Sequence, residues 1–271
     1  MAPLINADFE QHVVSQPTDY QWVGSPVSGV ERMRLDRVGD EVARATSIVR
    51  FAPHNTFSSH KHGGGEEFLV LEGVFSDEHQ DYPKGSYVRN PIGTSHTPKI
   101  GKAGAIVLVK LHQFDQYDKE QKVIDTQNSP WLQGLVDGLM VMPLHEFKGE
   151  HVALVKWAPH TQFQLHNHWG GEEIFVLEGT FYDEHGRYPK VKGHGAVQHL
   201  LEAITLYHLI IYDPKDFIRC VMDGLRFTIL SETPSVRASC FTLPPESFQS
   251  CAEPHAGCCG GWRLDTPRLP D

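Results

Sequence analysis

The strongest constraint on the fold is an internal repeat. The segment APHNTFSSHKHGGGEEFLVLEGVFSDEHQDYPK, residues 52–84, recurs 106 residues later and without a gap as APHTQFQLHNHWGGEEIFVLEGTFYDEHGRYPK, residues 158–190. Upstream, the match continues with a three-residue shift and pairs Trp22, Gly29, Met33 and Leu35 with Trp131, Gly138, Met142 and Leu144. Because self-similarity over such a length is the mark of a duplicated structural unit, we expect two similar units, each beginning near its tryptophan.

Both units have the pattern of short β-strands separated by turns. Runs of apolar and β-branched residues at 47–51, 68–71 and 105–109 indicate strands. Turn residues such as Gly73, Gly85 and Pro91-Ile92-Gly93 punctuate the chain about every ten residues, which is typical of a sandwich or a small barrel. Helical periodicity is scarce. We therefore predict an all-β fold.

The repeat also predicts the domain boundaries. We expect an N-terminal extension over 1–19, a first unit over 20–117, a polar connector over 118–130, a second unit over 131–190 and a divergent tail over 191–271. All five cysteines fall after residue 219, which sets the tail apart in composition.

Four residues of the first unit form a candidate metal site. His60 and His62 lie two apart on a predicted strand, so both imidazoles project from one face. Three glycines then permit a tight turn that returns the carboxylate of Glu66 to the same pocket. His96 follows a proline and a glycine that shape the approach of a neighbouring strand and supplies a fourth ligand.

Three imidazoles and one carboxylate suit a divalent transition metal and leave up to two positions of an octahedral ion open. Zinc and iron are the principal candidates, with manganese, nickel and copper as alternatives. Because ligation requires neutral histidine, we expect metal occupancy to fall in mild acid as the imidazoles protonate near pH ~6.5.

Two further residues adjoin this candidate site. Glu67 is the alternative carboxylate, but strand alternation points it to the opposite side, as a surface group or as an acceptor that hydrogen-bonds to a ligand. His54 recurs as His160, and it either lines the mouth of the site or lies at the edge of a strand.

The spacings His60-x-His62-x3-Glu66-x6-Gly73 and Gly85-x5-Pro91-x-Gly93-x2-His96 resemble the two cupin motifs, with His54 where the first motif usually begins with glycine. The segments GEEFLVLEG, FSDE and YPKGSYVRNP are most similar to those of ChrR-type cupins, and this resemblance extends over roughly residues 20–190. The resemblance implies two tandem cupin barrels, of the double-stranded β-helix or jelly-roll type, with a metal site.

Two functions follow from this resemblance. The namesake of the ChrR type is an anti-sigma factor whose zinc-binding cupin serves the response to singlet oxygen, which implies a sensory or binding protein related to oxidative-stress cupins. Related cupins are iron-dependent dioxygenases that cleave diketones or hydroxyaryl ketones, and this activity is the alternative.

The second unit repeats only part of the site. His166, His168 and Glu172 match the first three ligands, Trp169 replaces one glycine of the ligand loop, and Glu202 stands where the fourth ligand should be. His194, His199 and His208 are the candidate substitutes. We therefore expect an incomplete second metal site in an incomplete second barrel.

The repeat stops abruptly after Lys190. Codons permitted for residues 191–205 can encode, in another reading frame, an amino-acid sequence that resembles the missing second cupin motif. We interpret this as a change of reading frame, which predicts a poorly ordered tail. Divergence, with a genuine new tail, is the alternative.

Charge and hydropathy limit the partners. The net charge of −10 and the lack of a basic run argue against nucleic acid. No run approaches the ~20 apolar residues of a membrane helix, and the N-terminus lacks the pattern of a secretory signal. We expect a cytoplasmic protein whose partner is a small-molecule substrate or oxidant, and which forms a homo-oligomer through its strand edges.

Overall fold

In the computed structural model, the described residues are 4–9, 11–16, 18–19, 21–163, 171–183, 185–190 and, as backbone only, 204–211. They form 18 strands and no helix, which confirms the all-β prediction. No helix that could span a membrane occurs in this part of the chain.

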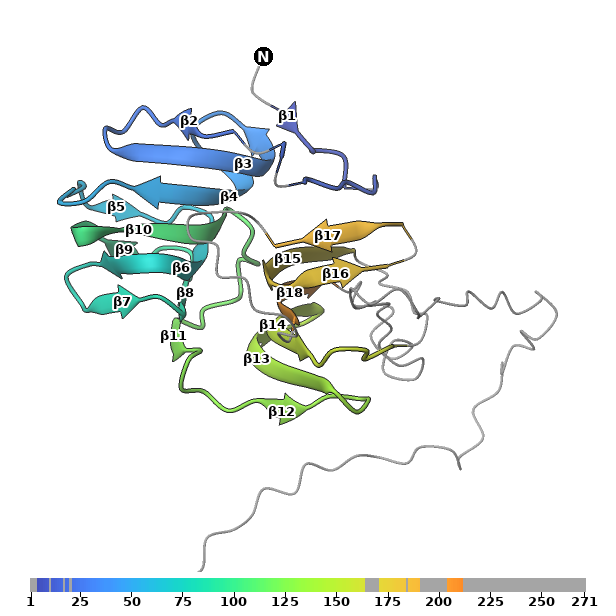
Figure 1. Ribbon diagram of the computed structural model, residues 1–271. Coiled ribbons are helices and arrows are strands. Elements are labelled where there is room, and N and C mark those ends of the chain that lie inside the picture. Colours follow the sequence, from blue (N-terminus) through green and yellow to red (C-terminus); the bar gives the residue numbers. More distant parts are fainter. Residues whose placement is uncertain are drawn as a thin grey trace, which may run out of the picture. The chain divides into compact units, whose positions relative to one another are not determined.

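The first repeat forms a nine-stranded sheet in which seven strands follow the order β1-β3-β4-β10-β6-β8-β11 (Figure 1). In addition, β2 pairs with β3, and β7 pairs with β6. The strands are β1 (Leu4–Ile5), β2 (Val23–Gly24), β3 (Val30–Gly39), β4 (Ala43–Phe51), β6 (Glu66–Ser76), β7 (Asp81–Pro83), β8 (Ser86–Asn90), β10 (Lys99–Leu111) and β11 (Lys122–Asp125). The three strands predicted from sequence lie within β4, β6 and β10.

Two short strands of the first repeat form a separate ribbon. They are β5 (His60–Lys61) and β9 (Ser95–His96), and they pair in antiparallel register with His60 opposite His96. Since residues directly opposite each other in an antiparallel pair have Cβ atoms ~5 Å apart, this register brings the first and last predicted ligands together.

The second repeat reproduces the same strand order. Its sheet runs β12-β13-β14-β18-β15, which corresponds to β2-β3-β4-β10-β6 in the first repeat. The strands are β12 (Leu132–Gln133), β13 (Leu139–Phe147), β14 (Glu150–Trp157), β15 (Glu172–Glu178) and β18 (Ile204–Ile211), with a separate hairpin of β16 (Thr180–Tyr182) and β17 (Arg187–Pro189). The sequence repeat is therefore also a structural one.

The observed strands cross the domain boundaries predicted from sequence. The N-terminal extension contributes β1, which pairs with β3, and the polar connector contributes β11, which pairs with β8. Residues 204–211, which fall within the predicted tail, form β18, which pairs with both β14 and β15. The rest of the tail lies outside the described residues, and the described residues all belong to one compact unit.

Alternation along β6 separates two apolar cores. Phe68 and Val70 pack into a core made by the first repeat alone. Leu69 points the other way, into a core shared with Leu154 and Phe175 of the second repeat. Each such side chain contributes about 1.5–3 kcal/mol when fully buried. The two faces of β6 therefore have different surroundings, and Glu66 and Glu67, at the start of this strand, lie on opposite faces.

Candidate metal centre

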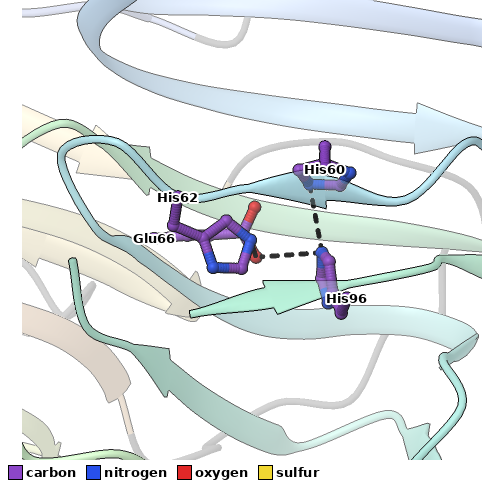
Figure 2. Close-up of side chains that lie close together, drawn as sticks. All are labelled: His60, His62, Glu66 and His96. Carbon is purple, nitrogen blue, oxygen red and sulfur yellow. Dashed lines mark hydrogen bonds and ion pairs between the residues drawn. The ribbon is translucent and has the colours of Figure 1, made fainter. Parts of the chain in front are cut away.

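The four predicted ligands converge in the structure. His60, His62, Glu66 and His96 each offer one ligand atom, and these atoms all lie within 4.8 Å of one another (Figure 2). His60 and His96 come from the β5–β9 ribbon, and Glu66 begins β6. The side chain of His60 is exposed, whereas His62, Glu66 and His96 are 5%, 9% and 3% exposed. The cluster is thus open to solvent on the side of His60.

The glycine loop between His62 and Glu66 is held against the chain that follows β10. The backbone N–H of His112 donates to the carbonyl of Gly65, and that of Phe114 donates to the carbonyl of Gly64. A Cβ atom on Gly64 would lie 2.6 Å from the Cα atom of His112, and one on Gly65 would lie 2.3 Å from the ring of Phe114. Only glycine fits such close approaches.

The first glycine of the loop is less constrained. A Cβ atom on Gly63 would lie 3.5 Å from the nearest atom of His112, which is an ordinary contact. Gly63 is also the glycine that the second repeat replaces, with Trp169. The structure therefore explains why this position, of the three, accepts a side chain.

Hydrogen bonding fixes the tautomer of His62. Its Nδ1 atom lies 2.8 Å from the hydroxyl oxygen of Thr94, and that hydroxyl donates its only proton to the carbonyl of Pro91, also at 2.8 Å. The Thr94 oxygen can therefore only accept from Nδ1–H. The Nε2 atom of His62 is left unprotonated, and it is buried without a hydrogen-bond donor. Because an unsatisfied buried acceptor is costly, a cation at this point is the natural partner.

The other donor atoms face the same point. The Nε2 atoms of His60 and His96 are 3.2 Å apart, and Oε1 of Glu66 lies 3.5 Å from Nε2 of His62 and 3.6 Å from Nε2 of His96. Ligand atoms about 2.1 Å from one ion lie about 3.0 Å apart at a right angle and about 3.4 Å apart at a tetrahedral angle. The residues therefore fit a first-row transition metal.

Burial shifts the protonation of the metal-free cluster. It lowers the pKa of His62 to about 4, with the neighbouring His96, His60 and His112 adding to the effect. Burial raises the pKa of Glu66 to about 7, against the opposing hydrogen bond from Asn90. The pKa of His96 is lowered by burial and by His60, although Asp77 opposes this. The pKa of His62 therefore lies below the ~6.5 of a free imidazole, and Glu66 takes up a proton as the pH falls below about 7.

Glu67 has a different environment from the one expected. It is 3% exposed, accepts a hydrogen bond of 2.8 Å from the Tyr87 hydroxyl, and forms an ion pair with Arg89. Arg89 in turn contacts Asp118 at 2.6 Å and Glu150 of the second repeat at 3.1 Å. Strand alternation does separate Glu67 from Glu66. The expectation that Glu67 is a surface group is wrong, because the second repeat covers this face of β6.

This buried charge network was not identified from the sequence. Arg89 is fully buried, its guanidinium lies 3.8 Å from the centre of the Phe114 ring, and His145 contacts Asp118 at 2.8 Å. The available signal was an arginine directly after Tyr87 and Val88 in a short strand, together with an aspartate in the segment predicted as a connector.

His54 lies in an exposed turn after β4. It has a positive φ of 60°, and its counterpart His160 has a φ of 65°. This conformation favours glycine, which accounts for the glycine that usually begins the first cupin motif. The backbone N–H of His54 donates to the carbonyl of Gly101 at 3.1 Å.

The predicted second site is described only in part. Glu172 begins β15 and is exposed, whereas Glu66, its counterpart, is 9% exposed. His166 and His168 lie outside the described residues, as do His194, His199 and Glu202. His208 lies opposite Ala153 in β14, the register position that Val109 has opposite Ser47 in the first repeat.

Comparisons of the chain with known proteins agree with this architecture. Among solved structures, a provisionally named dioxygenase from Nostoc punctiforme is similar with a TM-score of 0.51 at 20% identity, over 68% of this chain and 70% of that one. A protein from Pseudomonas aeruginosa, provisionally named as glyoxylate-induced, is similar with a TM-score of 0.50 at 13% identity, over 71% and 82%. At these identities the likeness shows the fold. None of the curated proteins matches the chain.

A family model matches both halves of the chain. The model describes the ChrR cupin-like domain, and it covers residues 10–115 and 119–208. The second match continues past Lys190, so the family likeness is longer than the stretch of roughly 20–190 inferred from sequence. The chain therefore belongs to the family of ChrR cupin-like proteins.

Proposed function

We propose that the protein is a metal-binding bicupin that acts as a sensory or binding protein related to the oxidative-stress cupins. One divalent transition metal, zinc or iron in the first place, is held by His60, His62, Glu66 and His96. The observation that carries this proposal is the convergence of three imidazoles and one carboxylate within 4.8 Å. Membership of the ChrR cupin-like family supports it.

The protein residues have distinct roles in this proposal. Thr94 orients His62, and the Gly64–Gly65 turn returns Glu66 beside it. When bound, the metal supplies a Lewis acid and a template with open positions. Because His60 lies at the exposed side of the cluster, a small molecule or an oxidant reaches the site from that side.

The second candidate function is an iron-dependent dioxygenase that cleaves a diketone or a hydroxyaryl ketone. The exposed side at His60 favours it, because a substrate needs access as well as ligands. The provisional name of the Nostoc punctiforme structure is in line with this candidate. In this case His60, His62, Glu66 and His96 hold ferrous iron, and the substrate is held next to them.

The metal content of the protein and its oxygen consumption separate the two candidates. Protein purified without added metal is analysed for its elements, and oxygen uptake is then measured with 2,4-pentanedione and with a hydroxyaryl ketone. Zinc without uptake supports the sensory or binding protein, and iron with substrate-dependent uptake supports the dioxygenase. A His62→Ala variant that retains the full metal content contradicts both.

A further inference from the structure

One acidic side chain next to the cluster has no place in the ligand set. Asp77 follows β6, and its Oδ2 atom lies 3.4 Å from Nδ1 of His96. Both side chains are 4% exposed. The contact is on the side of the imidazole away from the other three ligands, because Nε2 of His96 faces His60 and Glu66.

The carboxylate of Asp77 is held in place by donors alone. Its Oδ1 atom accepts hydrogen bonds from the backbone N–H groups of His79 at 2.8 Å and Gln80 at 3.1 Å. Its Oδ2 atom accepts a hydrogen bond of 3.0 Å from the hydroxyl of Tyr82. A carboxylate that receives three donors in this way is an acceptor toward its fourth neighbour, the imidazole of His96.

Nδ1 of His96 is buried and forms no hydrogen bond in the structure, and the carboxylate of Asp77, 3.4 Å away, is the acceptor that faces it. A neutral imidazole has one N–H group, and the carboxylate of Asp77 favours placing it on Nδ1. Nε2 then presents its lone pair to the cluster. Carboxylate partners of this kind orient metal-binding histidines and increase their basicity.

The second repeat contains the same turn. Asp183 accepts hydrogen bonds from the backbone N–H groups of His185 at 2.7 Å and Gly186 at 2.9 Å, and from the hydroxyl of Tyr188 at 2.9 Å. The turn therefore forms a stable acceptor in both repeats. The position that corresponds to His96 carries Glu202 in the second repeat, so the chain holds two copies of the turn but only one histidine in this place.

We infer that Asp77 is a positioning residue for the metal site, which holds His96 in the tautomer and orientation that present Nε2 to the ion. This inference rests on the proposed function, since it assigns a role toward the same metal. Asp77 contacts His96 and reaches the ion only through it.

The test is an Asp77→Asn substitution, which keeps the shape of the side chain. The amide oxygen can still accept from His79 and Gln80, but an NH2 group then faces His96 in place of an acceptor. This favours the tautomer with its proton on Nε2, on the side of the metal. We expect the affinity for Zn²⁺, measured by competition with a chromogenic chelator, to fall by about 10–100-fold. We also expect the visible absorption spectrum of the Co²⁺ protein to change.

Asp183→Asn is the matched control, because it makes the same change in the same turn. We expect it to leave the Zn²⁺ affinity and the Co²⁺ spectrum unchanged. Thermal unfolding of both variants without metal reports any general damage to the turn. Loss of affinity in both variants alike would show a structural effect and would overturn the inference.

A His62→Ala variant separates failure of the metal site from failure of the role of Asp77. If His62→Ala abolishes Zn²⁺ binding and Asp77→Asn leaves it within twofold of the original protein, the role of Asp77 is refuted and the metal site stands. If His62→Ala binds Zn²⁺ as the original protein does, the metal site itself is refuted.

Discussion

Replacement of Arg89 by methionine is the most severe test of the contact between the two repeats. Arg89 lies on β8 with no exposed surface, and it is paired with Glu67, Asp118 and Glu150. Methionine keeps most of the apolar stem that packs on Phe114, but it removes the permanent positive charge of Arg89. The other possible cation among these residues, His145, is charged only when it is protonated. Two carboxylates, 3% and 1% exposed, then remain in the interior.

Breaking a buried ion pair by removal of one partner costs about 3–5 kcal/mol. Glu67 loses its cationic partner, whereas Asp118 retains His145 at 2.8 Å and is partly compensated by protonation of that imidazole. We therefore expect Arg89→Met to lower the free energy of unfolding by about 4 kcal/mol. This is a large share of the total of about 5–15 kcal/mol that holds a typical domain folded.

The assay is urea unfolding at pH 7, followed by the fluorescence of the tryptophans. Arg32→Met is the control, since Arg32 pairs at 3.1 Å with Glu41, whose side chain is 54% exposed. Such a surface pair contributes about 0–1 kcal/mol. In the double variant Arg89→Met/Glu67→Gln, we expect partial recovery, because a neutral amide costs less to bury than an unpaired carboxylate. A loss in Arg89→Met no larger than in Arg32→Met would show that the buried ion pairs of Arg89 do not hold the two repeats together.

Three further predictions concern the metal site. Gly64→Ala places a methyl group 2.6 Å from a backbone atom and should destabilise the protein by about 1–3 kcal/mol, whereas Gly63→Ala should change stability by less than about 0.5 kcal/mol in the same urea assay. Metal binding should release about 0.9 proton from Glu66 at pH 6 and about 0.1 at pH 8, because its pKa of about 7 leaves it mostly protonated below that pH until the metal binds. Calorimetry in two buffers of different ionisation enthalpy measures this release, and equal values at the two pH values would contradict it. Thr94→Val removes the acceptor that fixes the tautomer of His62 and should weaken Zn²⁺ binding by about tenfold or more, so an unchanged dissociation constant would show that this contact is not needed.

The ligand set of the first repeat could be predicted from sequence because each ligand has a local signal. Two histidines at a spacing of two share a face, and glycines permit the turn before Glu66. The strand order of the second sheet could likewise be inferred from the repeat. The first inference depends on residues that are close together in the sequence, and the second depends on the internal repeat.

The contacts that escaped prediction depend on strands that are distant in sequence. Glu67 could not be assigned to the interior without knowing that the second repeat covers that face of β6. The buried position of Asp118 could not be inferred for the same reason, since its partners Arg89 and His145 lie on separate strands. In the sequence, Asp77 stood out only as part of the repeated tripeptide DEH, and nothing in this tripeptide indicates that His96 lies beside it.

X-ray absorption spectroscopy at the edge of the bound metal is the most direct test of whether His60, His62, Glu66 and His96 bind the metal. We predict one metal per chain, with scattering from three imidazole rings and with only nitrogen and oxygen donors bound to it, at about 2.0–2.2 Å if the metal is zinc. The chain also has five cysteines, all after residue 219. Sulfur bound to the metal, at about 2.3 Å for zinc, or a lack of imidazole scattering would place the metal elsewhere and contradict the proposed site.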